Sequence, residues 1–248
     1  MKILVTNDDG IFGPGIQLLA KALRAVGEVT VVAPDRERSA VGHALTLHHP
    51  LRATELEAGV FSVDGTPTDC VNLGIHTLLA EPPDIVVSGI NRGANMGDDI
   101  TYSGTVSAAM EATLMGIPAF AVSLATLGAG EYYEGAASFA ARLVQIILAN
   151  GLPRDTFLNV NVPDVPVDQL KSPIMTCQGK RDYGGQIVAK TDPRGRQYYW
   201  IGGSLPVFRD IEGTDFNAVR KGHISVTPLH LDMTNYASLD ALKSWHLG

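Results

Sequence analysis

The chain has 248 residues, of which 45% are hydrophobic and 18% are charged, so it can bury a substantial core and does not have the composition of a disordered chain. Its formal net charge of -7 argues against a general nucleic-acid-binding protein, which needs a basic surface. A small phosphate ligand remains compatible with this charge, because local groups and a metal can outweigh it.

The first predicted strand ends in an acidic turn. Ile3, Leu4 and Val5 form a short apolar run that is typical of a buried strand, and it stops at Asn7-Asp8-Asp9-Gly10. Adjacent carboxylates at the end of a buried strand repel each other and are costly to desolvate, and a cation removes both problems. Such hard oxygen ligands favour Mg²⁺, Mn²⁺ or Ca²⁺ over zinc, although a solvated turn explains these four residues equally well.

The next segments predict a parallel crossover unit. Apolar residues recur at helical spacing over 16–26, and Gly27 is a natural C-terminal stop. The run 29–33 predicts the second strand, so the chain opens strand–helix–strand. The polar loop 35–43 leaves the same sheet edge as the acidic turn, and patches of alternation in 44–64 predict short antiparallel strands or a hairpin.

A second helix begins at a favourable cap. Thr66 suits the N-cap, Pro67 the first helical position and Asp69 the positive end of the helix. The apolar pattern continues until Pro82-Pro83 breaks it, and residues 84–90 predict another buried strand.

A long polar, Gly-rich stretch covers residues 91–105 and leads into a helix of small residues at 106–112. Small side chains let such a helix pack close to a sheet. A strand at 119–123, a helix at 133–149 and a strand at 156–160 continue the alternation of strands and helices.

Beyond Pro163 the pattern loosens. Residues 178–218 are rich in Gly, Arg, Asp and aromatic residues without a sustained period, which is typical of a functional segment or an interaction arm. A late strand at 224–227 and a short helix at 239–245 complete the prediction.

Polar residues follow three of the predicted strands. Asp8 and Asp9 follow the first, Ser39 the second and Asn91 a later one. Because ligands of open parallel sheets bind outside the carboxyl ends of the strands, we expect these residues to converge. Two carboxylates, a hydroxyl and an amide oxygen form an all-oxygen shell that suits Mg²⁺ or Mn²⁺.

Ser103-Gly104-Thr105 stands where the helix of small residues begins. Free backbone N–H groups and the helix dipole favour an anion there, although ordinary N-capping is the alternative. Metal-binding carboxylates beside an anion site describe a phosphoryl-transfer centre.

Rival functions fit the motifs less well. Gly10, Gly13 and Gly15 do not form the G-x-G-x-x-G of a nicotinamide dehydrogenase, and no P-loop sequence occurs. A haloacid-dehalogenase-type phosphatase would separate its two aspartates by one residue, whereas Asp8 and Asp9 are adjacent. A non-catalytic nucleotide- or metal-binding regulatory module on the same fold stays open, and a turnover assay separates it from an enzyme.

Four motifs in order resemble the SurE nucleotidases, the stationary-phase survival phosphatases. They are residues 7–10 (NDDG), 33–39 (APDRERS), 65–70 (GTPTDC) and 88–105, which runs from SGIN to YSGT. The resemblance is specific from residue 1 to about 125 and looser through 158–163 and 214–219. It implies a Rossmann-like three-layer α/β sandwich with a mostly parallel sheet and an extended C-terminal arm. Residues 1–248 would then form one domain, with 178–248 including an oligomerisation arm and tail.

The resemblance also implies a metal-dependent phosphatase that acts on nucleoside 5′- and 3′-monophosphates and, in some members, on short polyphosphate. It implies one divalent ion per subunit, Mg²⁺ or Mn²⁺, with Ca²⁺ as an option in crystals, and homodimers or homotetramers with exchanged C-terminal arms. The implied residues are Asp8 and Asp9 as catalytic groups, Asp8, Asp9, Ser39 and Asn91 as metal ligands, and Asn95, Ser103, Gly104 and Thr105 around the phosphate.

Three further expectations come from single residues and composition. Cys70 and Cys177 have no zinc-type spacing and suit a reducing cytoplasm. No stretch has the length of a secretory core or a membrane span, so we expect a cytoplasmic protein without membrane or nucleic-acid polymer partners. His43 is a candidate proton donor for the leaving group, with solvation or a role in holding the loop as the alternatives.

Overall fold

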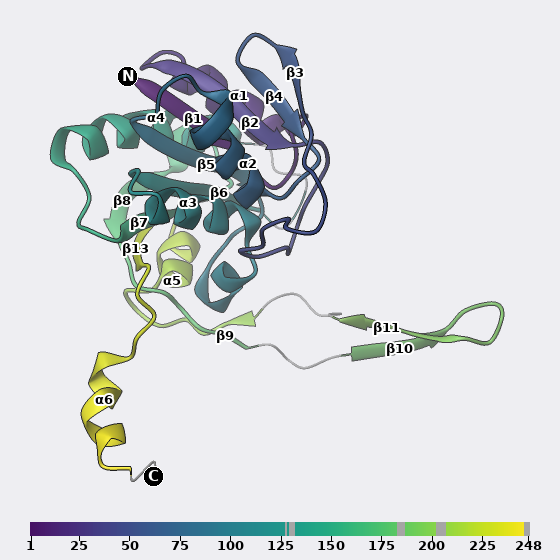
Figure 1. Ribbon diagram of the computed structural model, residues 1–248. Helices are drawn as coiled ribbons and strands as arrows, with labels where there is room; N and C mark the ends of the chain where they lie inside the picture. The colour runs from purple at the N-terminus through teal and green to yellow at the C-terminus, as the bar shows by residue number, and fades with distance from the viewer. Residues whose placement is uncertain (127, 129–131, 183–186, 202–206, 246–248) are drawn as a thin grey trace.

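The computed structural model describes residues 1–126, 128, 132–182, 187–201 and 207–245. Within them, a nine-stranded sheet runs in the order β3-β4-β2-β1-β5-β6-β7-β13-β8, with helices on both faces (Figure 1). The six strands from β4 to β7 in this order are mutually parallel, so the predicted three-layer, mostly parallel α/β fold is confirmed.

The N-terminal crossover unit forms as the periodicity predicts. It comprises β1 (Lys2–Thr6), α1 (Pro14–Leu23) and β2 (Glu28–Pro34). The helix ends three residues before the predicted limit, where the Gly27 N–H donates to the Leu23 carbonyl at 3.0 Å. At its start, a Cβ on Gly15 would lie 2.0 Å from the Ile90 carbonyl oxygen. The helix therefore lies directly against β5 (Ile85–Arg92).

The predicted hairpin is present but begins later than the alternating pattern suggests. It consists of β3 (Ala53–Glu57) and β4 (Val60–Val63), which pair antiparallel. The prediction of strand structure at residues 45–47 is wrong. Thr46 there donates from its N–H and its hydroxyl to the Asp69 carboxylate at 2.9 and 2.6 Å, so its polar groups serve the next helix instead of a strand partner.

The second helix has the predicted cap. Helix α2 (Pro67–Leu73) begins with a capping box in which Thr66 and Asp69 satisfy each other's backbone N–H groups, and it continues as the π-helix η1 (Gly74–Leu78). After β5 come the 3₁₀ helix η2 (Gly97–Thr101), α3 (Gly104–Leu114) and β6 (Ala119–Ala125).

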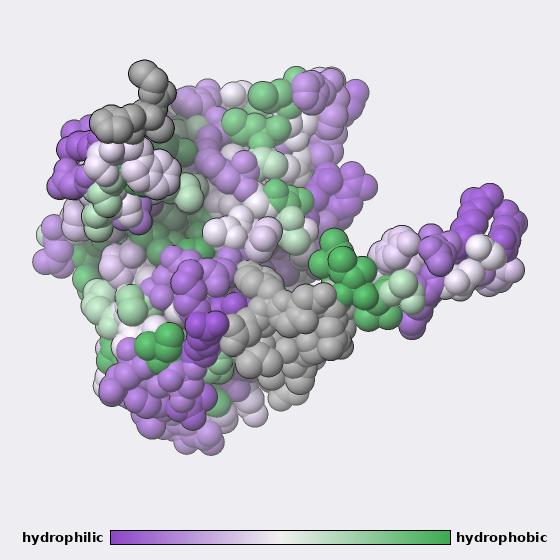
Figure 2. All heavy atoms as spheres, turned by 90° about the horizontal axis from the view of Figure 1, so that it is seen from below, coloured by the Kyte–Doolittle hydropathy of each residue, from purple (hydrophilic) through white to green (hydrophobic). Residues whose placement is uncertain are grey.

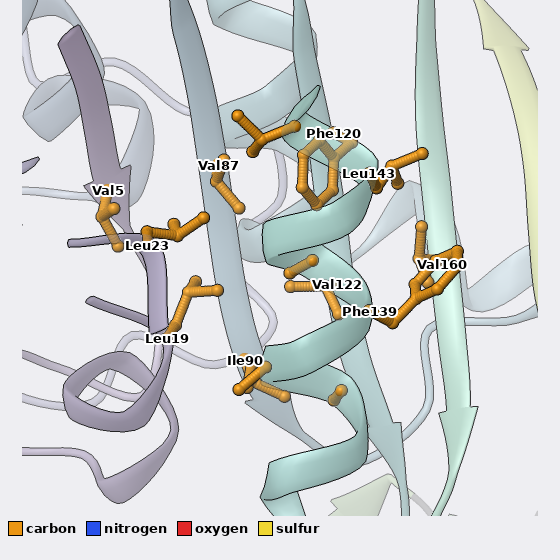
Figure 3. Close-up of a cluster of buried hydrophobic side chains, with 14 of the residues drawn as sticks. Val5, Leu19, Leu23, Val87, Ile90, Phe120, Val122, Phe139, Leu143 and Val160 are labelled. Carbon is orange, nitrogen blue, oxygen red and sulfur yellow. The ribbon is translucent and has the colours of Figure 1, made fainter. Parts of the chain in front are cut away.

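Two apolar layers enclose the sheet. One lies under α1 and α4 (Tyr133–Asn150), and the other lies under α2 and α3. Figure 3 shows the first layer, in which side chains of both helices meet side chains of the parallel strands, including β7 (Thr156–Pro163). The residues labelled there are Val5, Leu19, Leu23, Val87, Ile90, Phe120, Val122, Phe139, Leu143 and Val160.

The C-terminal third adds a second sheet edge and an arm. The edge contains η3 (Val167–Gln169), β8 (Lys171–Met175), α5 (Asp215–Arg220) and β13 (His223–His230), and the tail ends in α6 (Tyr236–Lys243). Residues 178–218 were expected to be irregular, but they contain two antiparallel pairs. These are β9 (Arg181–Asp182) with β12 (Val207–Phe208), and β10 (Ile187–Thr191) with β11 (Gln197–Ile201).

The β10–β11 hairpin stands clear of the body in both views (Figures 1 and 2). Both faces of this hairpin are largely exposed, so no alternation of apolar and polar residues marks its strands in the sequence. Its exposed apolar side chains include Ile187, Trp200 and Ile201.

Candidate active site

Asp8 is the most deeply buried of the predicted ligands. Its side chain is 5% exposed, and its carboxylate accepts hydrogen bonds from the Thr105 hydroxyl and, at 3.2 Å, from the Thr105 N–H. A Cβ on Gly104 would lie 3.0 Å from the Asp8 Cβ. The first turn of α3 therefore packs directly on the acidic end of β1, and a residue without a side chain permits that approach.

Burial disfavours the charged form of both carboxylates in the protein alone. The pKa of Asp8 is raised to about 6, chiefly because burial disfavours the charged form and also because of the charge of Asp9, while the hydrogen bonds from Thr105 oppose the rise. Burial also raises the pKa of Asp9, and Glu37 adds to this effect, while the N–H and the charge of Arg92 oppose it. A bound cation would offset both desolvation and repulsion.

Ser39 and Asn91 lie on the segments that flank this pair. The N–H of Arg38 donates to the Asp8 carbonyl at 2.7 Å, which brings the next residue, Ser39, to the site. The exposed Ser39 hydroxyl donates to Glu37 at 2.6 Å. Asn91 is half-buried and its Nδ2 donates to the Gly93 carbonyl at 2.8 Å, so its Oδ1 is the atom that could coordinate a metal.

The backbone brings Asn91 to the pair as well. The N–H of Arg92, the residue that follows it, donates to the Asp9 carboxylate at 2.9 Å. All four predicted ligands therefore belong to segments that are hydrogen-bonded to one another at the carboxyl ends of β1, β2 and β5.

A buried amide network fixes Asn95. Its N–H donates to Asn161, its carbonyl accepts from Asn159 and Asn161, and its Nδ2 donates to Ser123, all at 2.8 to 2.9 Å. Sequence reasoning missed the role of the two asparagines of β7. The sequence did contain a sign of this role, because the two asparagines are polar residues at alternate positions of an otherwise apolar strand.

The start of α3 carries the residues that the sequence predicts around an anion. Ser103 is the N-cap of this 11-residue helix, and its hydroxyl oxygen accepts from the Val106 N–H at 3.1 Å. The hydroxyl proton of Ser103 remains available for a second partner. Thr105 instead directs its hydroxyl and N–H to Asp8, so it acts on this site through that carboxylate.

The donor chemistry fits a hard divalent cation. Two carboxylates, a hydroxyl and an amide oxygen are the ligand types that Mg²⁺ and Mn²⁺ accept, with room for water. The buried Oδ1 of Asn7, beside the pair in sequence, has no hydrogen-bond partner among the described residues. Among the described residues, no group of three or more His, Cys, Asp or Glu side chains is placed to hold a metal. A metal here would therefore depend on neutral oxygen ligands besides the two aspartates.

His43 contacts a buried carboxylate that sequence reasoning also missed. Its Nε2 lies 2.6 Å from Glu111, which is 7% exposed and also accepts from Asn72 at 2.6 Å. The signal for Glu111 was a single acidic residue within a helix of small and apolar residues.

The chain is similar to known proteins over nearly its whole length. The family model described as "Survival protein SurE" matches residues 3–185. A protein of Geobacter sulfurreducens named "5'-nucleotidase SurE" is 76% identical over 247 residues, covering 100% of this chain and 94% of that protein. A protein of the same name from Geobacter metallireducens is 72% identical over 245 residues, covering 99% of this chain and 97% of that protein.

The fold is shared with a solved structure. The crystal structure of the SurE protein from Aquifex aeolicus superposes with a TM-score of 0.87 at 44% identity, covering 98% of each chain. Among the described residues, no helix is both long and apolar enough to cross a membrane. The matching family model, the full-length relatives and the shared fold show that this chain belongs to the SurE family.

Proposed function

We propose that this chain is a metal-dependent 5′-nucleotidase that hydrolyses nucleoside 5′-monophosphates to nucleoside and inorganic phosphate. The observation that carries the proposal is the buried Asp8–Asp9 pair packed against the first turn of α3. The name of the full-length relatives supports the same activity. Nucleoside 3′-monophosphates and short polyphosphate are further proposed substrates, since they present the same phosphoryl group.

Asp8, Asp9, Ser39 and Asn91 would hold one divalent ion, Mg²⁺ or Mn²⁺. When bound, such an ion polarises a phosphate oxygen and lowers the pKa of a bound water.

The chain's own groups bind and orient the phosphoryl group. The Ser103 hydroxyl and the Gly104 N–H donate to phosphoryl oxygens, and the helix dipole favours the charge that develops on them. In this proposal Asn95, which the amide network of β7 fixes in place, lies beside the phosphate, as the family resemblance implies.

Phosphate release from 5′-AMP, 3′-AMP and tripolyphosphate, each with Mn²⁺, with Mg²⁺ and with EDTA, tests the proposal. We expect metal-dependent release from 5′-AMP, and we expect Asp9→Asn to abolish it while the protein stays folded. Tight nucleotide binding without any release would contradict the enzyme and favour the non-catalytic regulatory module. A folded, fully active Asp9→Asn variant would contradict the assigned site.

The proposal extends to assembly. We propose that residues 1–248 form one domain and that the segment 178–248 includes an arm through which copies of the chain form a homodimer or homotetramer by exchange. The support is the exposed apolar surface of the projecting hairpin, where Ile187, Trp200 and Ile201 are 64%, 63% and 94% exposed. Figure 2 shows apolar side chains on the arm at its end nearest the body.

A further inference from the structure

We infer that His43 is a positioning residue, which fastens the loop carrying Ser39 to helix α3 through the buried carboxylate of Glu111. The inference rests on the proposed function, because it assigns Ser39 to the metal site. It concerns three segments that are distant in sequence: the loop after β2, helix α2 and helix α3.

Glu111 is the centre of this contact. Its side chain is 9% exposed, and its two oxygens are divided between His43 Nε2 and Asn72 Nδ2, each at 2.6 Å. Asn72 also donates to the Thr68 carbonyl at 3.3 Å, within α2. A buried carboxylate is costly unless its oxygens are hydrogen-bonded, so removing His43 would leave one oxygen of Glu111 without its partner.

Contacts on both sides of Ser39 hold the loop that carries it. Ser39 itself is exposed, and its hydroxyl bonds only within the loop, to Glu37. On its N-terminal side the loop is held by the Arg38 N–H to the Asp8 carbonyl at 2.7 Å.

On the C-terminal side of Ser39, the loop is held where it meets the phosphate-binding segment. The Gly42 N–H donates to the Tyr102 carbonyl at 3.1 Å, and His43 then contacts Glu111. Tyr102 immediately precedes Ser103, and Glu111 belongs to the helix that Ser103 caps. The two contacts therefore connect the Ser39 segment to the segment that carries the anion-binding groups.

The same geometry argues against His43 as the proton donor. Glu111 lies about 12 Å along the axis of α3 from its N-cap Ser103, at about 1.5 Å per residue. Its side chain tilts back by roughly one turn toward the N-terminus. The His43 Nε2 that contacts it therefore still lies roughly one turn from Ser103 along the helix axis. A general acid must lie within about 2.6–3.2 Å of the leaving oxygen.

The test is Mn²⁺ binding by calorimetry to the metal-stripped full chain, with His43→Ala, His43→Gln and His48→Ala. His48 lies in the same loop, is exposed and forms no hydrogen bond in the described structure, so it is the matched control. We expect His43→Ala to weaken Mn²⁺ binding about tenfold or more, as the loss of groups that orient metal ligands does. We expect His43→Gln to bind nearly as tightly as the parent, because its amide can donate to Glu111, and His48→Ala to match the parent.

Two substrates separate positioning from proton donation. We expect His43→Ala to lose equal activity on 5′-AMP and on p-nitrophenyl phosphate, and to recover at saturating Mn²⁺. A proton donor would instead show a loss of about 10²–10⁴-fold on 5′-AMP in His43→Gln as well, with p-nitrophenyl phosphate spared because its leaving group departs without a proton. That pattern, or unchanged Mn²⁺ binding by a folded His43→Ala protein, would overturn the inference.

The readouts also separate this inference from the proposed function. If the parent binds Mn²⁺ but releases no phosphate from any substrate, the nucleotidase proposal fails while the comparison of Mn²⁺ affinities still tests His43. If the parent binds no Mn²⁺, both fail together.

Discussion

Asp8 shows how the sequence creates a site that is unfavourable without a ligand. The residue lies at the end of a buried strand, and the first turn of α3 covers it. Two hydrogen bonds from Thr105 do not compensate for its desolvation, so its pKa rises from 3.8 to about 6. Asp8 therefore destabilises the metal-free protein locally, and a bound cation would stabilise its charged form.

This cost predicts a pH dependence of the metal-free protein. Because the folded pKa exceeds the unfolded one, the folded state holds more protons between about pH 4 and 6, and stability falls as the pH rises through that window. A shift of this size corresponds to about 3 kcal/mol. Urea unfolding in EDTA at pH 4.5 and 7 should show a smaller fall for Asp8→Asn than for the parent. An identical fall in both proteins would show that Asp8 does not titrate in this way.

A second prediction at this scale concerns Gly104. A methyl group there would lie 3.0 Å from the Asp8 Cβ and 3.1 Å from the Pro67 Cγ, so Gly104→Ala must push the start of α3 away from the acidic pair. We expect kcat/KM for 5′-AMP to fall about tenfold to a hundredfold, since small misplacements carry losses of this order. The control is Gly116→Ala, beyond the other end of α3, where nothing lies within 4 Å.

Gly116 has a φ of +78°, so its substitution should cost about 1 kcal/mol of stability without loss of activity. Equal loss of activity in both variants would argue against a special requirement at Gly104.

At the scale of elements, the segments with a buried face were predictable and the others were not. The crossover strands and α1 repeat apolar residues at the period of their structure, and the cap of α2 follows from Thr66, Pro67 and Asp69. The β10–β11 hairpin has no buried face in this chain and therefore no pattern. The segment 44–51 shows short alternation, but its polar groups are used by α2, a tertiary contact that alternation cannot reveal.

The same distinction holds for the site. The rule for parallel sheets predicted that the segments carrying Asp8, Asp9, Ser39 and Asn91 meet, because each lies at or beyond the carboxyl end of a strand. The Glu111 contact and the clamp of Asn159 and Asn161 on Asn95 depend on side chains brought together over long sequence distances. Strand order and helix placement must be known before such pairs can be inferred.

The cap of α2 gives a prediction for an element. The Thr66 hydroxyl accepts from the Asp69 N–H at 3.1 Å and donates to the Ala44 carbonyl at 2.7 Å, so it joins the helix to the loop before β3. We expect Thr66→Ala to lose about 1–2 kcal/mol of unfolding free energy, and Thr66→Ser to lose much less.

Denaturant unfolding with EDTA present measures this loss. Thr113→Ala is the control, because its hydroxyl bonds only within helix α3, to the Ala109 carbonyl, a contact that contributes little to helix stability. A Thr66→Ala protein as stable as the parent would show that water replaces the cap.

At the scale of the whole molecule, the arm is joined to the active-site loop as well as exposed to solvent. Lys180 and Arg181, at its base, form ion pairs with Asp98 and Asp99 of η2. Buried Asp215 accepts from the Gly97 and Gly179 N–H groups at 2.8 and 3.0 Å. The segment that leads into the arm thus contacts the loop between Asn91 and Ser103, so an assembly formed through the arm would also constrain this loop.

The assembly proposal predicts that charge on the hairpin dissociates copies of the chain without unfolding them. Ile187 and Ile201 are cross-strand partners, so Ile187→Lys with Ile201→Glu replaces an apolar pair by an opposite-charge pair that keeps the strands together. We expect light scattering to show a smaller assembly for this double variant than for the parent. In the control, Thr191→Lys with Gln197→Glu changes the partner pair at the other end of the same hairpin and should leave the assembly intact. If both variants keep the parent's mass, the arm does not hold copies together, because a buried apolar contact would not tolerate two new charges.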